Sequence, residues 1–178
     1  ILDLATEEGY GFSKFISYGN AMNIDESDLI EYLGNDEKTK VICLYVEGVK
    51  DGGKFLRVAR AVSKKKPIIA IKGGKTAEGA KATMSHTGAL AGAAHIYSGI
   101  FRQAGVIEVN SLEEMFETAK MLEKCTCPRG GRVLVITNGG GYGILSTDAI
   151  ISSGLQMAQL GKESVSQLKQ LLPRVQSH

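Results

Sequence analysis

The sequence predicts an α/β fold in which helices cover both faces of parallel sheets. Short apolar runs typical of buried strands alternate with segments of helical periodicity. The 22 glycines cluster at the ends of the apolar runs, where turns between strands and helices are required. Strands that alternate with helices form parallel sheets with helical crossovers. We therefore expect a flavodoxin-like or Rossmann-like arrangement.

The N-terminal segment predicts a helix, a strand and a second helix. Apolar residues in 1–10 fall at helical spacing, and two glycines end the run. Residues 14–18 (KFISY) form a candidate strand. The acidic stretch 25–28 favours a helix N-terminus, and residues 29–33 continue that helix to Gly34. Because the first residue is not Met and lies within a predicted helix, we expect the chain to be a piece of a longer protein.

A repeated strand and helix pattern follows. Residues 41–46 (VICLYV) are an apolar run typical of a buried parallel strand, and residues 55–62 have helical spacing. The next candidates are, in order, a strand at 67–71, a helix containing 96–103, a strand at 106–109 and a helix from 111 to 122. Ser111 and Glu114 predict a capping box at the start of that last helix.

The proline- and glycine-bearing stretch 125–131 predicts a linker, after which the pattern restarts. The later candidates are a strand at 132–137, a glycine loop at 138–143, a helix at 144–153, a strand within 155–160 and a helix at 164–172. We therefore expect one nearly complete domain, residues 1–124, and the first part of a second domain, residues 132–178.

Composition and charge exclude several classes of protein. Charged residues make up 22% and the net charge is +2, so charge gives no indication of a nucleic-acid or membrane partner. No apolar run is long enough to span a bilayer, and no signal peptide is visible. The odd number of cysteines argues against a disulfide scaffold and favours a reducing, cytoplasmic setting. The Cys125-Thr126-Cys127 pair lacks partners for a metal site.

The motif Ser85-His86-Thr87-Gly88 is the strongest functional candidate. A glycine-rich turn into a helix exposes backbone N–H groups that favour an anion, and small residues let the backbone approach it. His86 could bind that anion, or it could be a nucleophile that takes up a phosphoryl group. The alternative is a histidine that only caps a helix together with its neighbours.

Two other positions could contribute to such a site. The loop at 138–143 (NGGGYG) could bind phosphate through backbone N–H groups, although a tight turn is the alternative, and it is not a Walker A loop. Glu47 ends the apolar run at 41–46, and ligands gather at the carboxyl ends of parallel strands. Its carboxylate could hold one ring nitrogen of a histidine, or it could be an exposed glutamate without a role.

These residues together resemble a known family. The stretches KPIIAIKGGKTAEGAKATMSHTGALAG, IFRQAGVIEVNSLEEMFE and GGRVLVITNGGGYG are similar to parts of the ADP-forming acyl-CoA synthetases, which include acetate–CoA ligases and are relatives of succinyl-CoA synthetase. The resemblance covers essentially the whole chain. It implies a reversible reaction in which acyl-CoA, phosphate and ADP give a carboxylic acid, CoA and ATP.

The resemblance also implies roles for individual residues. His86 matches the histidine that is phosphorylated in the family, and Glu47 matches the glutamate that orients it. In the family the phosphohistidine lies between two helix N-termini, one of which matches the loop at 138–143; the other would precede Ile1. The expected phosphate-binding residues are Ser85, Thr87, Gly88, Asn138, Gly139, Gly140, Gly141 and Tyr142. The substrate and CoA are expected near Gly19, Asn20, Gly48 and Lys72.

The family further implies CoA, ATP or ADP and Mg²⁺ as ligands of the complete enzyme, none held wholly within this chain. CoA-binding and ATP-grasp domains or subunits would be its partners in a homo- or hetero-oligomer, so we expect residues 1–178 alone to be inactive. Two alternatives remain: a ligand-sensing regulatory module of a synthetase-like protein acetyltransferase, and succinyl-CoA synthetase itself. The intact motif at His86 counts against the regulatory module.

Overall fold

The computed structural model describes residues 2–7, 9–19, 21–87, 94–125 and 128–171. The chain divides into two compact units, which are residues 1–126 (unit 1) and residues 127–178 (unit 2). None of the helices in the described ranges is both long and apolar enough to cross a membrane.

Unit 1 is built on a parallel sheet of three strands in the order β1-β2-β3. The strands are β1 (Ile42–Val46), β2 (Ile68–Lys72) and β3 (Ile107–Val109). Helix α3 (Gly52–Val62) connects β1 to β2, while α4 (Ala77–Thr87) and α5 (Ala94–Ala104) lie between β2 and β3 in the chain. The predicted parallel sheet with helical crossovers is therefore confirmed.

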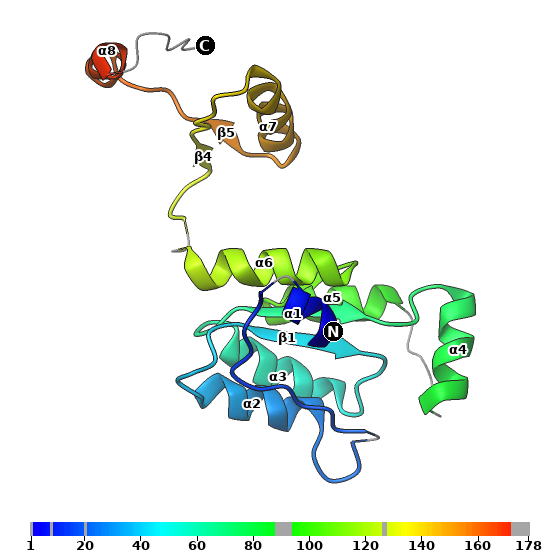
Figure 1. The fold of residues 1–178 in the computed structure, drawn as a ribbon. Coiled ribbons are helices and arrows are strands. Elements are labelled where there is room, and N and C mark those ends of the chain that lie inside the picture. Colours follow the sequence, from blue (N-terminus) through cyan, green and yellow to red (C-terminus); the bar gives the residue numbers. More distant parts are fainter. Residues whose placement is uncertain (1, 8, 20, 88–93, 126–127, 172–178) are drawn as a thin grey trace. The chain divides into compact units, whose positions relative to one another are not determined.

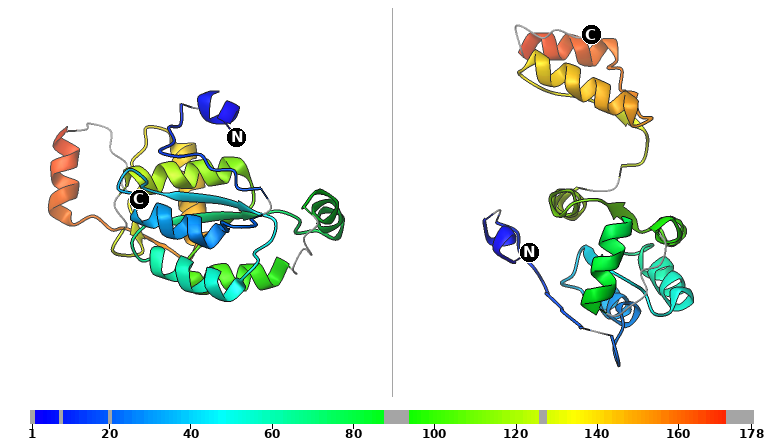
Figure 2. Two further views of the ribbon diagram at one scale, coloured as in Figure 1. Left: turned by 90° about the horizontal axis from the view of Figure 1, so that it is seen from below. Right: turned by 90° about the vertical axis from the view of Figure 1, so that its right-hand side faces the viewer.

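Both faces of the sheet are covered, because the side chains of β2 alternate between two cores. Ile68 and Ala70 pack with residues of α2 (Glu26–Asn35), α3 and α5, whereas Ile69 and Ile71 pack with α6 (Leu112–Lys124). Figure 1 shows α6 on one side of the sheet with α2 and α3 on the other, and the views in Figure 2 agree. Full burial of an aliphatic or aromatic side chain contributes about 1.5–3 kcal/mol. The predicted helices on both faces are confirmed.

The helices of unit 1 begin where the sequence supplies caps. The carboxylate of Asp25 accepts hydrogen bonds from the backbone N–H groups of Ser27 (2.8 Å) and Asp28 (3.0 Å), and Asp28 returns the bond to the Asp25 N–H (3.1 Å). This is a complete capping box at the start of α2.

At α6 only half of the predicted box is present. The Ser111 hydroxyl accepts from the Glu114 N–H at 3.1 Å. The Glu114 carboxylate instead accepts from the N–H of Asn110 at 2.8 Å, one residue before the cap. The Glu114 side chain is thus engaged by the N–H of the residue just after β3 rather than by that of the cap residue.

The predicted strand at 14–18 is wrong. The structure places no strand there, and Phe15 and Ile16 are exposed rather than packed against the sheet. Side chains fasten this segment instead. Lys14 forms an ion pair with Asp36 at 2.8 Å, and the Ser13 and Thr39 hydroxyls are 2.9 Å apart. Helix α1 (Leu2–Glu7) precedes it, as expected.

Unit 2 contains a parallel pair, β4 (Arg132–Val133) and β5 (Gln156–Met157), with α7 (Gly140–Ser152) and α8 (Lys162–Leu171). The predicted strands at 132–137 and 155–160 are each shortened to two residues. The helix predicted at 144–153 begins four residues earlier, so the glycine loop itself forms its first turn. Glycine can adopt helical dihedral angles as well as turn angles. A run of glycines therefore does not by itself indicate a loop, which is why the predicted start of the helix was too late.

The contact between α2 and α3 depends on the absence of a side chain at Gly34. A Cβ there would lie 2.8 and 2.9 Å from the two methyl groups of Val62. We expect Gly34→Ala to lower the free energy of unfolding by about 1 kcal/mol, because overpacking costs more than the gain in helix propensity. Gly99→Ala in α5, where nothing lies within 4 Å, should instead raise it by about 0.5–1 kcal/mol.

Urea unfolding followed by circular dichroism measures both changes. In a Val62→Ala background, Gly34→Ala should become stabilising, because the colliding methyl groups are gone. If Gly34→Ala alone is as stable as Gly99→Ala, the helices can move apart and the close contact does not limit this position.

A second expectation concerns acid. Hydrogen bonds from Lys14 and Thr39 lower the pKa of Asp36 from its usual 3.8 to about 2. A carboxyl whose pKa is depressed by folding stabilises the fold above its unfolded pKa, and that stability is lost as the pH falls through the folded pKa. Asp36→Asn should therefore reduce the free energy of unfolding at neutral pH, and the difference from the unaltered chain should close between about pH 4 and pH 2. Urea titrations across this range test it, and a constant difference would contradict it.

Candidate functional site

The carboxyl ends of β1 and β2 meet at one edge of the sheet. Val46 is in register with Lys72, and the N–H of Gly73 donates to the Val46 carbonyl at 2.9 Å. Glu47 follows β1 at this edge and is half-buried. The Tyr45 hydroxyl donates to Glu47 Oε1 at 3.3 Å. Parallel pairing therefore places Glu47 and Gly48, just after β1, at the same sheet edge as Lys72, the last residue of β2.

Tyr45 and Glu47 lie so close to the backbone at position 73 that only glycine fits there without a shift of these side chains. A Cβ at that position would lie 2.6 Å from the Tyr45 hydroxyl oxygen and 3.4 Å from Cγ of Glu47. Burial, followed by the charge of Glu47 and its hydrogen bond, raises the pKa of Tyr45. The hydroxyl consequently remains a protonated donor beside the carboxylate.

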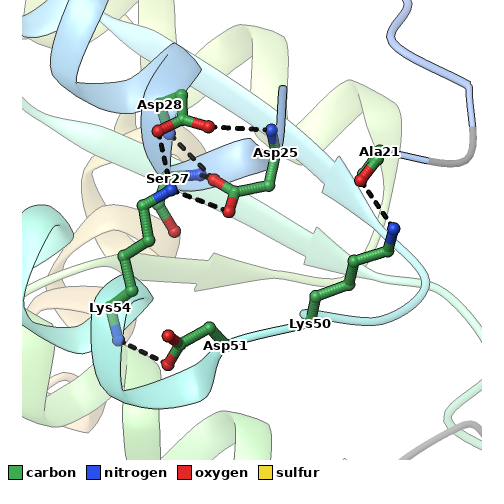
Figure 3. Close-up of polar contacts among 7 residues, drawn as sticks. All are labelled: Ala21, Asp25, Ser27, Asp28, Lys50, Asp51 and Lys54. Carbon is green, nitrogen blue, oxygen red and sulfur yellow. Dashed lines mark hydrogen bonds and ion pairs between the residues drawn. The ribbon is translucent and has the colours of Figure 1, made fainter. Parts of the chain in front are cut away.

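The turn before α2 and the first turn of α2 are fastened to the loop after β1 and to the start of α3. Lys50 donates to the Ala21 carbonyl at 2.6 Å, and Lys54 binds the carboxylates of Asp25 (2.8 Å) and Asp28 (2.6 Å). Figure 3 shows these contacts. Ala21 has a φ of 52°, a left-handed conformation that costs energy for a residue with a Cβ, so the fastening holds a strained turn. Sequence reasoning missed these lysines, whose only local signal is the spacing of Asp51 and Lys54.

Beside this turn lies an open groove of about 550 Å³. Its lining consists of Ile16, Ser17, Tyr18, Met22, Asn23, Ile24 and Leu29. Burial, together with the charges of Glu26, Asp25 and Glu47, raises the pKa of Tyr18 to about 12. Gly19, with a φ of 58°, lies next to Tyr18, whereas Asn20 falls outside the described residues.

The histidine motif lies at the far end of α4. The structure continues this helix through Ser85, His86 and Thr87, where the sequence predicted a turn before a helix. Alanines and a first-turn glutamate in residues 77–87 favour the longer helix, and Thr76 caps it by accepting from the Gly79 N–H at 3.0 Å. Gly88 and the side chains of the other three motif residues lie outside the described part of the chain.

In unit 2 the predicted phosphate loop opens α7. Gly139 is the N-cap and makes no side-chain capping bond, while Gly140, Gly141 and Tyr142 form the first turn. Asn138 directly precedes the cap. The Thr137 hydroxyl accepts from the Gly139 N–H at 3.1 Å. The N-terminus of α7 thus presents backbone N–H groups without a side-chain cap from its N-cap residue, which is the geometry expected of an anion site.

One lysine near this edge, Lys75, is accounted for by ordinary contacts. Lys75, close to the strand edge, pairs with Glu108 at 2.7 Å and donates to Asn110 at 2.9 Å. Within the described ranges, no group of three or more His, Cys, Asp or Glu side chains could hold a metal ion.

Comparisons with known proteins give a family match and several similar proteins. Residues 1–122 match the profile of the succinyl-CoA ligase-like flavodoxin domain. The chain is 45% identical to an ADP-forming acetate–CoA ligase I of Archaeoglobus fulgidus, over 97% of this chain and 25% of that protein. It is 46% identical to the alpha subunit of an ADP-forming acetate–CoA ligase II of Pyrococcus furiosus, over 94% of this chain and 36% of the subunit.

A solved structure is also similar. The dinucleotide-forming acetyl-coenzyme A synthetase 1 of Ca. Korarchaeum cryptofilum, in complex with phosphate and ADP, superposes with a TM-score of 0.90 at 37% identity. The match covers 98% of this chain and 38% of that one. The chain therefore spans between 25% and 38% of the length of these relatives.

The close contact between Gly73 and the Tyr45 hydroxyl allows a test of the side-chain arrangement at this sheet edge. We expect Gly73→Ala to leave the fold intact, because the colliding Tyr45 hydroxyl ends a side chain that is 53% exposed and can swing away. Once Tyr45 has moved, its pKa should fall toward its usual 10, since burial and Glu47 both contribute less. Titration of ¹³C-labelled tyrosine by NMR, assigned with Tyr45→Phe, measures this pKa. An unchanged Tyr45 pKa would mean that the backbone moved instead.

Proposed function

The chain belongs to the family of succinyl-CoA ligase-like flavodoxin domains, and from this premise we propose that it is part of an ADP-forming acyl-CoA synthetase. The proposed enzyme converts acyl-CoA, phosphate and ADP reversibly into a carboxylic acid, CoA and ATP. The relatives named as acetate–CoA ligases support the reaction class. Residues 1–124 would be the histidine-bearing domain, and residues 132–178 the start of a second ligase domain.

In the proposed mechanism His86 carries the phosphoryl group. Phosphate first attacks the carbonyl carbon of acyl-CoA, the C–S bond breaks, and CoA leaves as an acyl phosphate forms. A ring nitrogen of His86 then attacks the phosphorus of this acyl phosphate, the P–O bond to the acyl group breaks, and the carboxylate leaves. A terminal oxygen of ADP then attacks the same phosphorus, the P–N bond breaks, and ATP leaves with a neutral imidazole restored. Each of the two phosphoryl transfers is an in-line displacement in which a nucleophile replaces one leaving group at phosphorus.

The single observation that carries this proposal within the structure is the position of Glu47. Its half-buried carboxylate lies at the carboxyl edge of the sheet, next to the end of β2 from which the chain leads into α4 and His86. A carboxylate that accepts a hydrogen bond from one imidazole nitrogen fixes the tautomer and leaves the other nitrogen nucleophilic. We assign Glu47 as the positioning residue for His86.

The remaining assignments concern anion and substrate contacts. Ser85, Thr87 and Gly88 would bind the phosphoryl group beside His86, and the N-terminus of α7, from Asn138 to Tyr142, is a proposed anion site of unit 2. Gly19, Asn20, Gly48 and Lys72 would border the substrate or CoA. The solved relative was bound to phosphate and ADP, which supports these ligand classes.

The rest of the enzyme would supply CoA-binding and ATP-grasp domains and the Mg²⁺ that accompanies the nucleotide. The relative named as an alpha subunit supports a partner subunit. We accordingly propose that residues 1–178 by themselves do not turn over.

The decisive test is phosphorylation of the full-length protein. Incubation with Mg²⁺ and γ-³²P-labelled ATP, or with ³²P-labelled acetyl phosphate, should leave acid-labile, base-stable label on the protein. His86→Ala should abolish that label completely, because no other group replaces the nitrogen nucleophile. Glu47→Gln should lower the labelling rate by about 10²-fold, since orientation and the partner charge are both lost.

His95→Ala is the matched control, since His95 is an exposed residue of α5. It should label like the unaltered protein. Label that persists in His86→Ala would place the carrier elsewhere. A folded, unaltered protein that binds acyl-CoA but takes no label would refute the carrier role and favour a regulatory module.

A further inference from the structure

A second, smaller pocket of about 280 Å³ lies at the carboxyl edge of the sheet in unit 1. Its lining consists of Tyr45 in β1, Ile71 in β2, Asn110 just after β3, and Ser111 and Leu112 at the start of α6. In parallel-sheet proteins ligands bind in the crevice outside the carboxyl ends of the strands. The pocket therefore lies where this class of fold holds its ligands.

One wall of the pocket is in direct contact with Glu47. Tyr45 is the register partner of Ile71, which packs in the core on the α6 face of the sheet. The Tyr45 hydroxyl donates a hydrogen bond to Glu47 Oε1 at 3.3 Å. The pocket thus adjoins the carboxylate that we assign to position His86, and it lies on the same face of the sheet as that carboxylate.

The lining of the pocket is mainly apolar. Ile71 is 8% exposed and Leu112 is partly buried against the same core. The Asn110 side chain accepts from the Lys75 ammonium at 2.9 Å, and the Ser111 hydroxyl accepts from a backbone N–H of α6 at 3.1 Å. Among the described residues, no charged side chain lines the pocket. Such a surface favours a hydrocarbon group over a phosphate or a ribose.

The volume of the pocket separates the candidate occupants. Pockets that hold drug-sized ligands measure about 300–1,000 Å³. At about 280 Å³ this pocket is too small for a whole nucleotide or for CoA, but it suits the carbon chain of a small carboxylic acid. Each methylene buried in such a pocket adds about fourfold in affinity.

We propose that the pocket formed by Tyr45, Ile71 and Leu112 holds the hydrocarbon part of the acyl group, so that these three side chains set the acyl specificity of the enzyme. This inference rests on the proposed function of Glu47 and His86. The carbon chain lies against Ile71 and Leu112, and the reacting end of the acyl group points to the sheet edge.

Leu112 is the lining residue best suited to a test. Ile71 belongs to the central strand, and Tyr45 donates to Glu47, so changes at either position would disturb more than the pocket. Leu112 is the first residue of α6 and is only partly buried. Its size can therefore be changed in both directions.

The test measures kcat/KM of the complete enzyme for acetate and for butyrate, with CoA, ATP and Mg²⁺. Leu112→Phe fills part of the pocket and should lower the butyrate-to-acetate ratio of kcat/KM about tenfold, because the longer chain loses its space. Leu112→Ala enlarges the pocket and should raise the same ratio about tenfold. Two shifts of opposite sign are not expected from a general loss of stability.

A second measurement reports on the phosphoryl-transfer site by itself. Labelling of His86 from γ-³²P-labelled ATP involves no acyl group, so it shows whether a variant retains that site. Tyr45→Phe keeps the ring in the pocket wall and removes only the donor to Glu47. Its labelling rate should fall about fivefold, the size of one hydrogen bond, while the butyrate-to-acetate ratio stays unchanged.

Met121 provides the matched controls. It lies on the same helix as Leu112, is 55% exposed and does not line the pocket. Met121→Phe and Met121→Ala make the corresponding changes of size, and both should leave the butyrate-to-acetate ratio as it is in the unaltered enzyme.

The outcomes are separable. If both Leu112 variants label His86 and retain the unaltered ratio, the inference is wrong while the proposed function stands. An unchanged ratio with a raised KM for CoA would assign the pocket to the CoA chain, which also overturns the inference. If one Leu112 variant does not fold, the shift in the other decides. If the unaltered protein takes no label, the proposed function fails, and this inference fails with it.

Discussion

Burial of strand β2 on both faces is the constraint on which unit 1 depends. All five of its residues are buried, with alternate side chains assigned to the two cores. A strand covered on both sides must be central, which fixes β1 and β3 as its neighbours and sets the register of their ends. The edge that carries Glu47 inherits its geometry from this register, because the parallel pairing of β1 with β2 places the end of β1 beside Lys72.

The fold could be predicted where local and tertiary preferences agree. The apolar runs at 41–46 and 67–71 became β1 and β2, and the acidic stretch at 25 produced a complete capping box. The strand predicted at 14–18 does not form. Its side chains are exposed or held by an ion pair, and its backbone joins no strand of the sheet. Short apolar runs do not identify a strand unless a partner edge is available, and periodicity contains no information about that partner.

The candidate site was only partly accessible from sequence. Glu47 could be proposed from the sequence because ligands of parallel-sheet proteins gather at the carboxyl ends of strands. Lys72 could be placed near the edge, but its burial against Tyr97 required knowledge of how α5 packs, 25 residues along the chain. Lys50 and Lys54 resemble ordinary surface lysines in the sequence, and their role in fastening the turn before α2 appears only when α2 and α3 are docked.

The two units differ sharply in how much side-chain packing holds them. In α7 only Ile150 is buried, α8 buries none of its residues, and the β4–β5 pair is two residues long. Backbone amides exchange with solvent through local openings whose free energy reflects such packing. The amide hydrogens of unit 2 should therefore exchange with deuterium within a small fraction of the time that β2 requires. A single chain would then show two very different exchange rates.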